Sequence, residues 1–240
     1  MIDSEAVLEE VRRRLRREPR IDFDHQAISL TFANGELLLA GEVGDIAAKR
    51  LAVERAAIAP PVTAVFDELR VRPAESLSDS EIRDLVRQAL VGEPALTGCT
   101  IREHVGDRLQ LVHSPLTNVG RIDMGVVRGV VTLVGVVPSL AQKRLAGVLA
   151  WWSPATRDVA NSLDVQPAEE DSDELICDAV RLVLDRDSAI QAAGIRVSAR
   201  DGRVTLAGTV RTASELAAAE HDTWFVLGVR DVVNHLTVGA

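Results

Sequence analysis

A ten-residue phrase that occurs three times is the strongest constraint on how this chain folds. It reads NGELLLAGEV at 34–43, RGVVTLVGVV at 128–137 and DGRVTLAGTV at 201–210. The surrounding blocks align without gaps over 28–71, 122–165 and 195–238. Repetition of this kind is typical of several small structural units rather than one large domain.

Each phrase contains two glycines, six residues apart. The first follows an apolar alternating stretch, and the Asn-Gly and Asp-Gly pairs at two of these turns favour tight hairpins, because both central positions need positive φ. The second lies within a strand, where glycine suggests a bulge or the close approach of another backbone. We interpret six residues as this structural signature: Gly35, Gly41, Gly129, Gly135, Gly202 and Gly208.

The same glycines do not match a phosphate-binding loop. Such loops read GxxxxGK[ST] or GxGxxG, and they join a strand to the N-terminus of a helix. Five residues separate Gly129 from Gly135, and two valines follow the second glycine. The phrase therefore predicts architecture rather than a binding site.

Helices flank each pair of predicted strands. An alanine-rich amphipathic stretch follows each phrase, as in SLAQKRLAGVLAWW at 139–152, and an alternating strand closes the unit. Another helix precedes each unit, and Ser78 is the candidate N-cap of the second such helix. The predicted fold class is α+β: three tandem αββαβ units, each a small mixed three-stranded sheet covered by two helices on one face.

The order αββαβ, the phrase VTLAGTV after a turn glycine and the closing VRDVVNHLTV together resemble BON domains. This resemblance covers three copies and nearly the whole chain, with expected boundaries at 3–72, 78–166 and 171–239. The second copy departs from the pattern by an insertion at about 96–121. Its alternating RLQLV predicts an added strand or hairpin, and Pro115 predicts a turn after it.

No pattern of residues indicates catalysis, so we expect a protein that is not an enzyme and that uses no cofactor or metal. The five histidines are scattered, and CxxC, HExxH and GxSxG spacings do not occur. Cys99 and Cys177 are interpreted as free buried thiols in a reducing compartment. The net charge of −9 disfavours nucleic acid as a partner.

The N-terminal residues carry acids where a secretory signal needs a basic segment. The sequence contains no run of about 18 apolar residues, the length that a membrane-spanning helix needs. We therefore expect a cytoplasmic location without a signal peptide or transmembrane segment, with peripheral attachment to the membrane left open.

The resemblance implies a bacterial protein that is linked to envelope or osmotic stress and binds phospholipid surfaces. The arginine-rich stretch RRRLRREPR at 12–20 contains three candidates for anionic headgroups: Arg13, Arg16 and Arg17. Four more candidates lie on the helices after the glycine phrases: Lys49, Arg50, Lys143 and Arg144. Each basic residue near an anionic surface contributes about 1 kcal/mol. A solvated helix face is the alternative interpretation for both groups.

Two tryptophans occupy equivalent positions in copies two and three. Trp151 and Trp224 lie about 100° from the core-facing stripe of their helices. One prediction is that they are partly exposed, where an amphipathic ring suits a membrane interface or a protein partner. Packing between neighbouring repeats is the alternative.

Two other classes of function remain open at this point. One is a soluble small-ligand or ion sensor, or a protein-interaction scaffold, for which the grooves between units and the insertion would matter most. The other is self-association through the open faces of the sheets.

Overall fold

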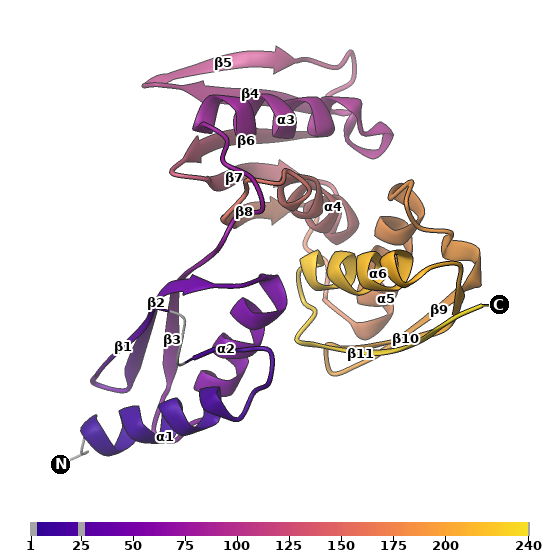
Figure 1. Cartoon of the computed structure of the whole chain (residues 1–240). Helices are drawn as coiled ribbons and strands as arrows, with labels where there is room; N and C mark the ends of the chain where they lie inside the picture. The colour runs from indigo at the N-terminus through magenta and orange to yellow at the C-terminus, as the bar shows by residue number, and fades with distance from the viewer. Residues whose placement is uncertain (1–3, 24–26, 240) are drawn as a thin grey trace. The chain divides into compact units, whose positions relative to one another are not determined.

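The computed structural model describes residues 4–23 and 27–239. Residue 3, at which the first expected domain begins, lies outside the described residues. The chain divides into two compact units, Met1–Arg72 and Pro73–Ala240. Unit 1 contains one copy of the repeat (domain 1), and unit 2 contains the other two (domain 2 and domain 3), as Figure 1 shows.

Domain 1 has two helices and three strands. In chain order they are α1 (Ser4–Arg16), β1 (Ile28–Ala33), β2 (Glu36–Val43), α2 (Ile46–Ala57) and β3 (Ala64–Val71). The sheet order is β1-β2-β3, with β1 and β2 antiparallel and β2 and β3 parallel. Both helices cover one face of this sheet, because α1 buries Val7, Val11 and Leu15 on a single stripe.

Domain 2 repeats this arrangement with two extra strands. Its elements are α3 (Asp79–Gly92), the 3-10 turn η1 (Pro94–Leu96), β4 (Cys99–Val105), β5 (Arg108–His113), β6 (Gly120–Val127), β7 (Val130–Val137), α4 (Leu140–Trp151) and β8 (Asp158–Val165). The sheet order is β5-β4-β6-β7-β8. Its core is continuous from α3 through the central strands to α4.

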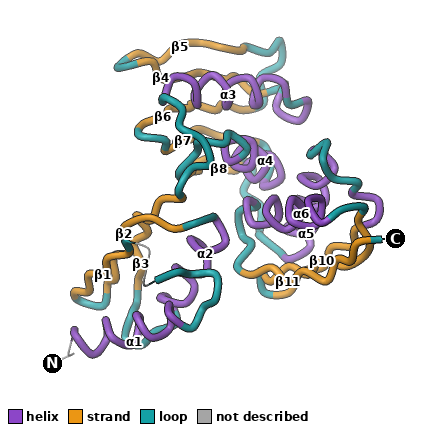
Figure 2. Tube along the Cα trace, in the orientation of Figure 1, coloured by secondary structure: helices purple, strands orange, loops and turns teal. Residues whose placement is uncertain are grey.

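Domain 3 has the smaller form again. Its elements are α5 (Asp173–Arg186), the 3-10 turn η2 (Ala192–Gly194), β9 (Ile195–Arg200), β10 (Arg203–Val210), α6 (Ala213–Phe225) and β11 (Asp231–Val238). The sheet order is β11-β10-β9. The predicted α+β fold in three repeated units is therefore confirmed, and Figure 2 shows the same alternation of helices and strands along the chain.

The insertion in domain 2 forms the β4–β5 hairpin. The stretch RLQLV lies in β5, so the prediction of an added strand or hairpin is confirmed. β4 pairs in parallel with β6, and β5 pairs antiparallel with the outer side of β4. The sheet of domain 2 consequently has five strands rather than the three that were expected for every copy.

The first glycine of each phrase completes a tight turn. Asn34, Arg128 and Asp201 have φ of 52°, 52° and 53°, and the glycines after them also have positive φ. Two consecutive residues with positive φ define the type I′ hairpin turn that the dipeptides predicted. Arg128 adopts this conformation although its side chain gives it no local advantage there.

The second glycine of each phrase allows two backbones to approach closely. A Cβ atom on Gly41, Gly135 or Gly208 would collide with a backbone carbonyl oxygen, of Ala27, Arg121 and Gly194 respectively. All three glycines also have φ between 128° and 139°. Any side chain would therefore be excluded by contact and by backbone conformation together.

Two aspartates connect the first helix of a domain to its hairpin turn. The carboxylate of Asp79 accepts hydrogen bonds from the backbone N–H groups of Arg128 and Gly129, at 2.7 and 2.8 Å. Asp173 accepts equivalent bonds from Asp201 and Gly202, at 2.7 and 2.9 Å. The first residue of α1 in domain 1 is Ser4. Ser4, the first described residue of domain 1, carries no carboxylate.

The helix starts follow local capping rules. Ser78 accepts a hydrogen bond from the N–H of Glu81, and the Glu81 carboxylate accepts one from the N–H of Ser78. This reciprocal pair is a capping box, so the predicted N-cap of α3 is confirmed. A hydrogen bond from the Ser78 hydroxyl to the Glu81 carboxylate, together with the bond from the Ser78 N–H, lowers the pKa of Glu81.

Candidate functional site

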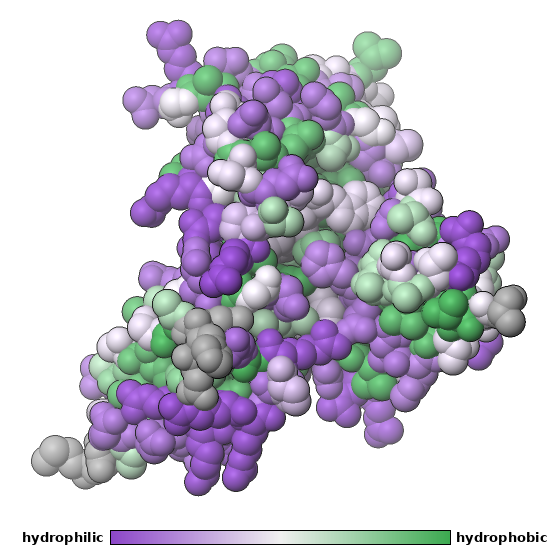
Figure 3. All heavy atoms as spheres, viewed as in Figure 1, coloured by the Kyte–Doolittle hydropathy of each residue, from purple (hydrophilic) through white to green (hydrophobic). Residues whose placement is uncertain are grey.

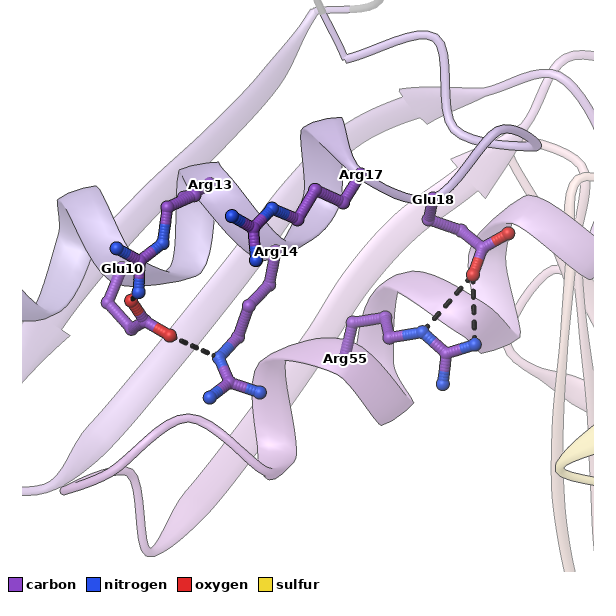
Figure 4. Close-up of a pocket in the computed structure, with 6 residues that line it drawn as sticks. All are labelled: Glu10, Arg13, Arg14, Arg17, Glu18 and Arg55. Carbon is purple, nitrogen blue, oxygen red and sulfur yellow. Dashed lines mark hydrogen bonds and ion pairs between the residues drawn. The ribbon is translucent and has the colours of Figure 1, made fainter.

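Four arginines and two glutamates line a pocket of domain 1 between α1 and α2 that opens to solvent. It has a volume of about 290 Å³ and is lined by Glu10, Arg13, Arg14, Arg17, Glu18 and Arg55. We call this the basic pocket. Figure 4 shows Arg14 extending from α1 toward α2, which carries Arg55, and Arg17 extending from the turn after α1 back along that helix.

The pocket follows from the spacing of apolar residues on α1. Val7, Val11 and Leu15 are buried, so the arginines between them lie on the outward side of the helix. The side chain of Arg13 is 60% exposed. Figure 3 shows hydrophilic atoms gathered over this part of domain 1.

Two carboxylates hold three of the four arginines in place. Glu10 pairs with Arg13, and it accepts a hydrogen bond from Arg14 Nε at 2.6 Å. Glu18 Oε2 accepts two bonds from Arg55, from Nε at 3.1 Å and from Nη2 at 2.9 Å. No hydrogen bond or ion pair joins the side chain of Arg17 to another residue of 4–23 and 27–239. Four guanidinium groups against two carboxylates leave the basic pocket with a surplus of two positive charges.

Arg12 and Arg16 flank the pocket but have other contacts. Arg12 pairs with Glu5 at 2.9 Å, and this hydrogen bond raises the pKa of Arg12. The guanidinium carbon of Arg16 lies 5.5 Å from the ring centroid of Phe23, a cation–π contact on an exposed side chain.

Lys49 does not form part of an exposed surface. It is only 6% exposed, and its Nζ donates to the carbonyl of Leu69 at 2.6 Å and pairs with Asp67 at 2.7 Å. The expectation that Lys49 lies on an exposed helix face is wrong, because its ammonium group pairs with a carboxylate inside domain 1. Its neighbour Arg50 is half-buried.

Arg144 lies inside the contact between domains 2 and 3. It is 2% exposed, its Nε donates to the carbonyl of Leu227 at 2.8 Å, and its Nη2 pairs with Asp171 at 2.6 Å. The expectation that Arg144 is a surface residue is therefore wrong, because the loop after α6 and the linker before α5 cover it. Lys143 is half-buried.

The two candidate tryptophans are buried as well. Trp151 is 8% exposed and stacks on Phe225 of domain 3, with ring centroids 5.5 Å apart and an interplanar angle of 11°. Trp224 is 1% exposed. The prediction of partial exposure is wrong for both, because the C-terminal ends of α4 and α6 pack against neighbouring elements. For Trp151 the alternative, packing between repeats, is confirmed.

A buried carboxyl group completes this contact between domains. Asp222 of α6 is 4% exposed, and its Oδ1 accepts a hydrogen bond from the indole Nε1 of Trp152 at 3.0 Å. Burial raises the pKa of Asp222 to about 7, the Trp152 bond opposes this rise, and the neighbouring Asp187 adds to it. The interface therefore contains a carboxyl group that ionises near neutral pH.

The basic pocket includes four residues that the sequence did not single out. Arg14 belongs to the arginine-rich stretch at 12–20, so composition alone signals it. Glu10 joins it through local pairs with Arg13 and Arg14 on α1 itself. Glu18 and Arg55 join it only through the packing of α2 on α1. No local pattern places Arg55 beside residues about forty positions earlier.

The remaining chemical candidates are the histidines, the carboxylates and the two cysteines. Among residues 4–23 and 27–239, which exclude His25, no group of three or more His, Cys, Asp or Glu has a metal-binding arrangement. Cys99 and Cys177 are free and buried, as predicted, and burial raises the pKa of both thiols. In the described part of the chain, no helix has the length and apolar character to cross a bilayer.

Comparison with known proteins gives one family. The family model described as BON domain matches residues 3–73, 78–167 and 172–240. A comparison with curated proteins finds no match.

Two solved structures are similar to this chain at low identity. Both are of CdsD, a structural protein of the type III secretion system of Chlamydia trachomatis, and both are 16% identical to this chain. One covers 98% of this chain and 92% of its own, with a TM-score of 0.25. The other, a C-terminal domain, covers 100% of both chains, with a TM-score of 0.26. Similarity at this level supports no argument about function.

Proposed function

The chain belongs to the BON domain family, and from this premise we propose that it attaches to anionic phospholipid surfaces through the basic pocket of domain 1. BON domains are generally non-catalytic and are associated with membrane and osmotic-stress proteins. We infer a non-enzymatic bacterial protein that acts in envelope or osmotic stress. Its attachment is peripheral and takes place from the cytoplasm.

One observation supports this proposal above the others. Arg13, Arg14, Arg17 and Arg55 converge from two helices on one pocket that opens to solvent. A guanidinium group presents its N–H donors in a planar fork that matches two oxygens of a phosphate. The pocket therefore has the donors and the positive surplus that a phospholipid headgroup requires.

The carboxylates of the pocket make the interaction reversible. Glu10 and Glu18 already accept hydrogen bonds from three of the arginines, so a phosphate competes with them for donors. Arg17 meets no such competition within the described residues. We expect Arg17 to make the first contact with a headgroup and the paired arginines to contribute mainly through their charge.

The buried candidates have no part in this attachment. Trp151, Trp224, Lys49 and Arg144 lie within the protein and cannot reach a lipid surface without rearrangement. Arg16, Arg50 and Lys143 are at least partly exposed and can add to the attraction. The proposed attachment is consequently electrostatic at domain 1, without aromatic anchors.

Vesicle co-sedimentation tests this function. Vesicles that contain phosphatidylglycerol should sediment the protein at low salt, whereas phosphatidylcholine vesicles should not. Raising the salt to 0.5 M should weaken the electrostatic part of this binding, because the Debye length falls to a few ångströms. The double variant Arg13→Gln/Arg17→Gln should weaken binding by about tenfold or more, at about 1 kcal/mol for each basic residue.

Domain 3 provides a matched control. Arg196→Gln/Arg200→Gln removes the same charge from two exposed arginines of β9 and should leave vesicle binding within about twofold. Equal weakening by both double variants would show that net charge alone matters, and it would reject the basic pocket. A failure of the unmodified protein to sediment at low salt would reject the function.

A soluble phosphorylated ligand is the second candidate, because the same donors suit a free phosphate group. Inorganic phosphate or glycerol phosphate should then raise the melting temperature of the protein, and the Arg13→Gln/Arg17→Gln variant should lose this rise. A rise of this kind without vesicle binding would favour the soluble ligand over the membrane.

A further inference from the structure

Part of the inserted segment of domain 2 carries basic residues and no acidic residues. Residues 108–122 contain no aspartate or glutamate, although the chain has 36 acidic residues among 240. The same stretch contains Arg108, His113 and Arg121. Its positive balance contrasts with the net charge of −9 for the whole chain.

Large apolar side chains are exposed on the same segment. Leu111 is 63% exposed, Leu116 is fully exposed and Val119 is 51% exposed, and Leu109 follows at 39%. Leu116 and Val119 belong to the loop between β5 and β6, at one end of the sheet. Figure 3 shows hydrophobic atoms projecting at the upper right, where Figure 1 places the end of β5.

Nothing in the described part of domain 2 covers this segment. β5 is the outermost strand of the five-stranded sheet, and α3 packs on β4 and β6. Register places Leu109 opposite His104 and Leu111 opposite Arg102 on β4. Arg102 is itself held by two bonds of 2.6 Å to Asp123, which is also 3.3 Å from Arg121. The leucines therefore project from a sheet face on which the Asp123 carboxylate is neutralised by two arginines.

The first strands of the other two sheets, β1 and β9, lack this combination. On β1 the outward residues are Ser29, Thr31 and Ala33. On β9 they are Arg196, Ser198 and Arg200. Charged or small residues of this kind protect sheet edges from unwanted pairing. The insertion instead presents exposed leucines between arginines. Protection of the sheet edge does not explain these leucines.

We propose that the inserted segment 108–121 is a second membrane contact, in which Leu111, Leu116 and Val119 enter the headgroup region of an anionic bilayer while Arg108 and Arg121 face the phosphates. The apolar side chains gain by leaving water, and the arginines complement the anionic surface. This contact rests on the proposed function, and it adds an apolar, salt-resistant component that the basic pocket cannot supply.

A fluorescent label next to Leu116 tests the contact directly. Thr117→Cys introduces an exposed thiol, whereas Cys99 and Cys177 are buried, so an environment-sensitive nitrobenzoxadiazole label attaches selectively. With phosphatidylglycerol vesicles the label should become several-fold brighter and shift to the blue. The matched control is Ser198→Cys, an exposed site between two arginines on β9, where the label should not respond.

The double variant Leu111→Ser/Leu116→Ser tests the apolar component. It should lower the vesicle partition coefficient by about tenfold, and most of the loss should persist in 0.5 M salt. Both side chains are exposed, so the circular dichroism spectrum and the melting temperature should be unchanged.

The possible outcomes separate this inference from the proposed function. Vesicle binding with an unresponsive label at position 117 overturns the inserted contact and leaves the basic pocket standing. A responsive label in the Arg13→Gln/Arg17→Gln variant, together with unaltered affinity, supports the inserted contact and rejects the pocket. A dimer in light scattering that Leu111→Ser/Leu116→Ser dissociates, with no vesicle response, overturns the membrane contact in favour of a second copy of this chain.

Discussion

The crossover helices of domain 1 and domain 2 have related sequences and different surroundings. Arg50 of α2 and Arg144 of α4 occupy equivalent positions, as do Ile58 and Trp152. In domain 1, Arg50 is half-buried and Ile58 is 58% exposed. In domain 2, Arg144 is 2% exposed and Trp152 donates a hydrogen bond to domain 3. Equivalent positions of the repeat can thus be solvent-accessible in one copy and buried in a domain interface in another. In domain 2 the packing of domain 3 causes the burial.

Substitution of the second glycine of the repeated phrase tests a feature that the domains share, the close approach of two backbones. Gly41→Ala in domain 1 and Gly135→Ala in domain 2 should each lower the free energy of unfolding by on the order of 4 kcal/mol, because of backbone collision and positive φ. Urea denaturation followed by circular dichroism measures both. Gly92→Ala, which meets no neighbour within 4 Å, is the control and should be nearly neutral. A mild effect at only one of the two sites would show that the copies are not equivalent there.

Substitution of the two equivalent arginines, Arg50 and Arg144, tests how the crossover helices of domains 1 and 2 differ. Arg144→Ala should destabilise unit 2 by about 3 kcal/mol, because the Leu227 carbonyl and Asp171 lose a buried donor. Arg50→Ala should cost less than about 1 kcal/mol at its half-exposed site. Differential scanning calorimetry of the full chain measures both changes. Equal losses would contradict the contrast between the two helices.

Asp222 adds a pH dependence to unit 2 alone. Its pKa is raised from 3.8 to about 7 in the folded protein, so between these values the folded state binds a proton that the unfolded state has released. Stability from this group therefore falls as the pH rises from about 4 to about 7, by on the order of 4 kcal/mol, and is constant above that range. Asp222→Asn should flatten this part of the stability profile. An unchanged profile in chemical denaturation at pH 5 and pH 8 would refute the assignment.

The helix-to-turn aspartates give the smallest expected effect. Asp79→Asn and Asp173→Asn should each cost about 1 kcal/mol, since the amide oxygen can replace only one of two charge-assisted bonds. Native-state hydrogen exchange should then be faster at Gly129 and Gly202. Ser4→Asp in domain 1 is the converse test, and protection of the Gly35 amide should increase if the copies are equivalent.

Local signals in the sequence predicted most of the fold. The turn dipeptides, the N-cap at Ser78 and the strand in RLQLV depend on residues a few positions apart, and each is confirmed. The burial of Trp151 and Arg144 depends on residues from Asp171 to Leu227, which a helical wheel does not include. The basic pocket was partly predictable. The arginine run at 12–20 indicated its α1 side, whereas Arg55 joins it only because α2 packs on α1.

The distribution of tryptophan gives the protein a built-in spectroscopic division. All three indoles, at 151, 152 and 224, lie in unit 2, and domain 1 has none. Emission excited at 295 nm therefore reports on unit 2, while the basic pocket remains dark. A fluorescence transition that precedes or follows the circular dichroism transition would assign the order in which the two units unfold, without any label.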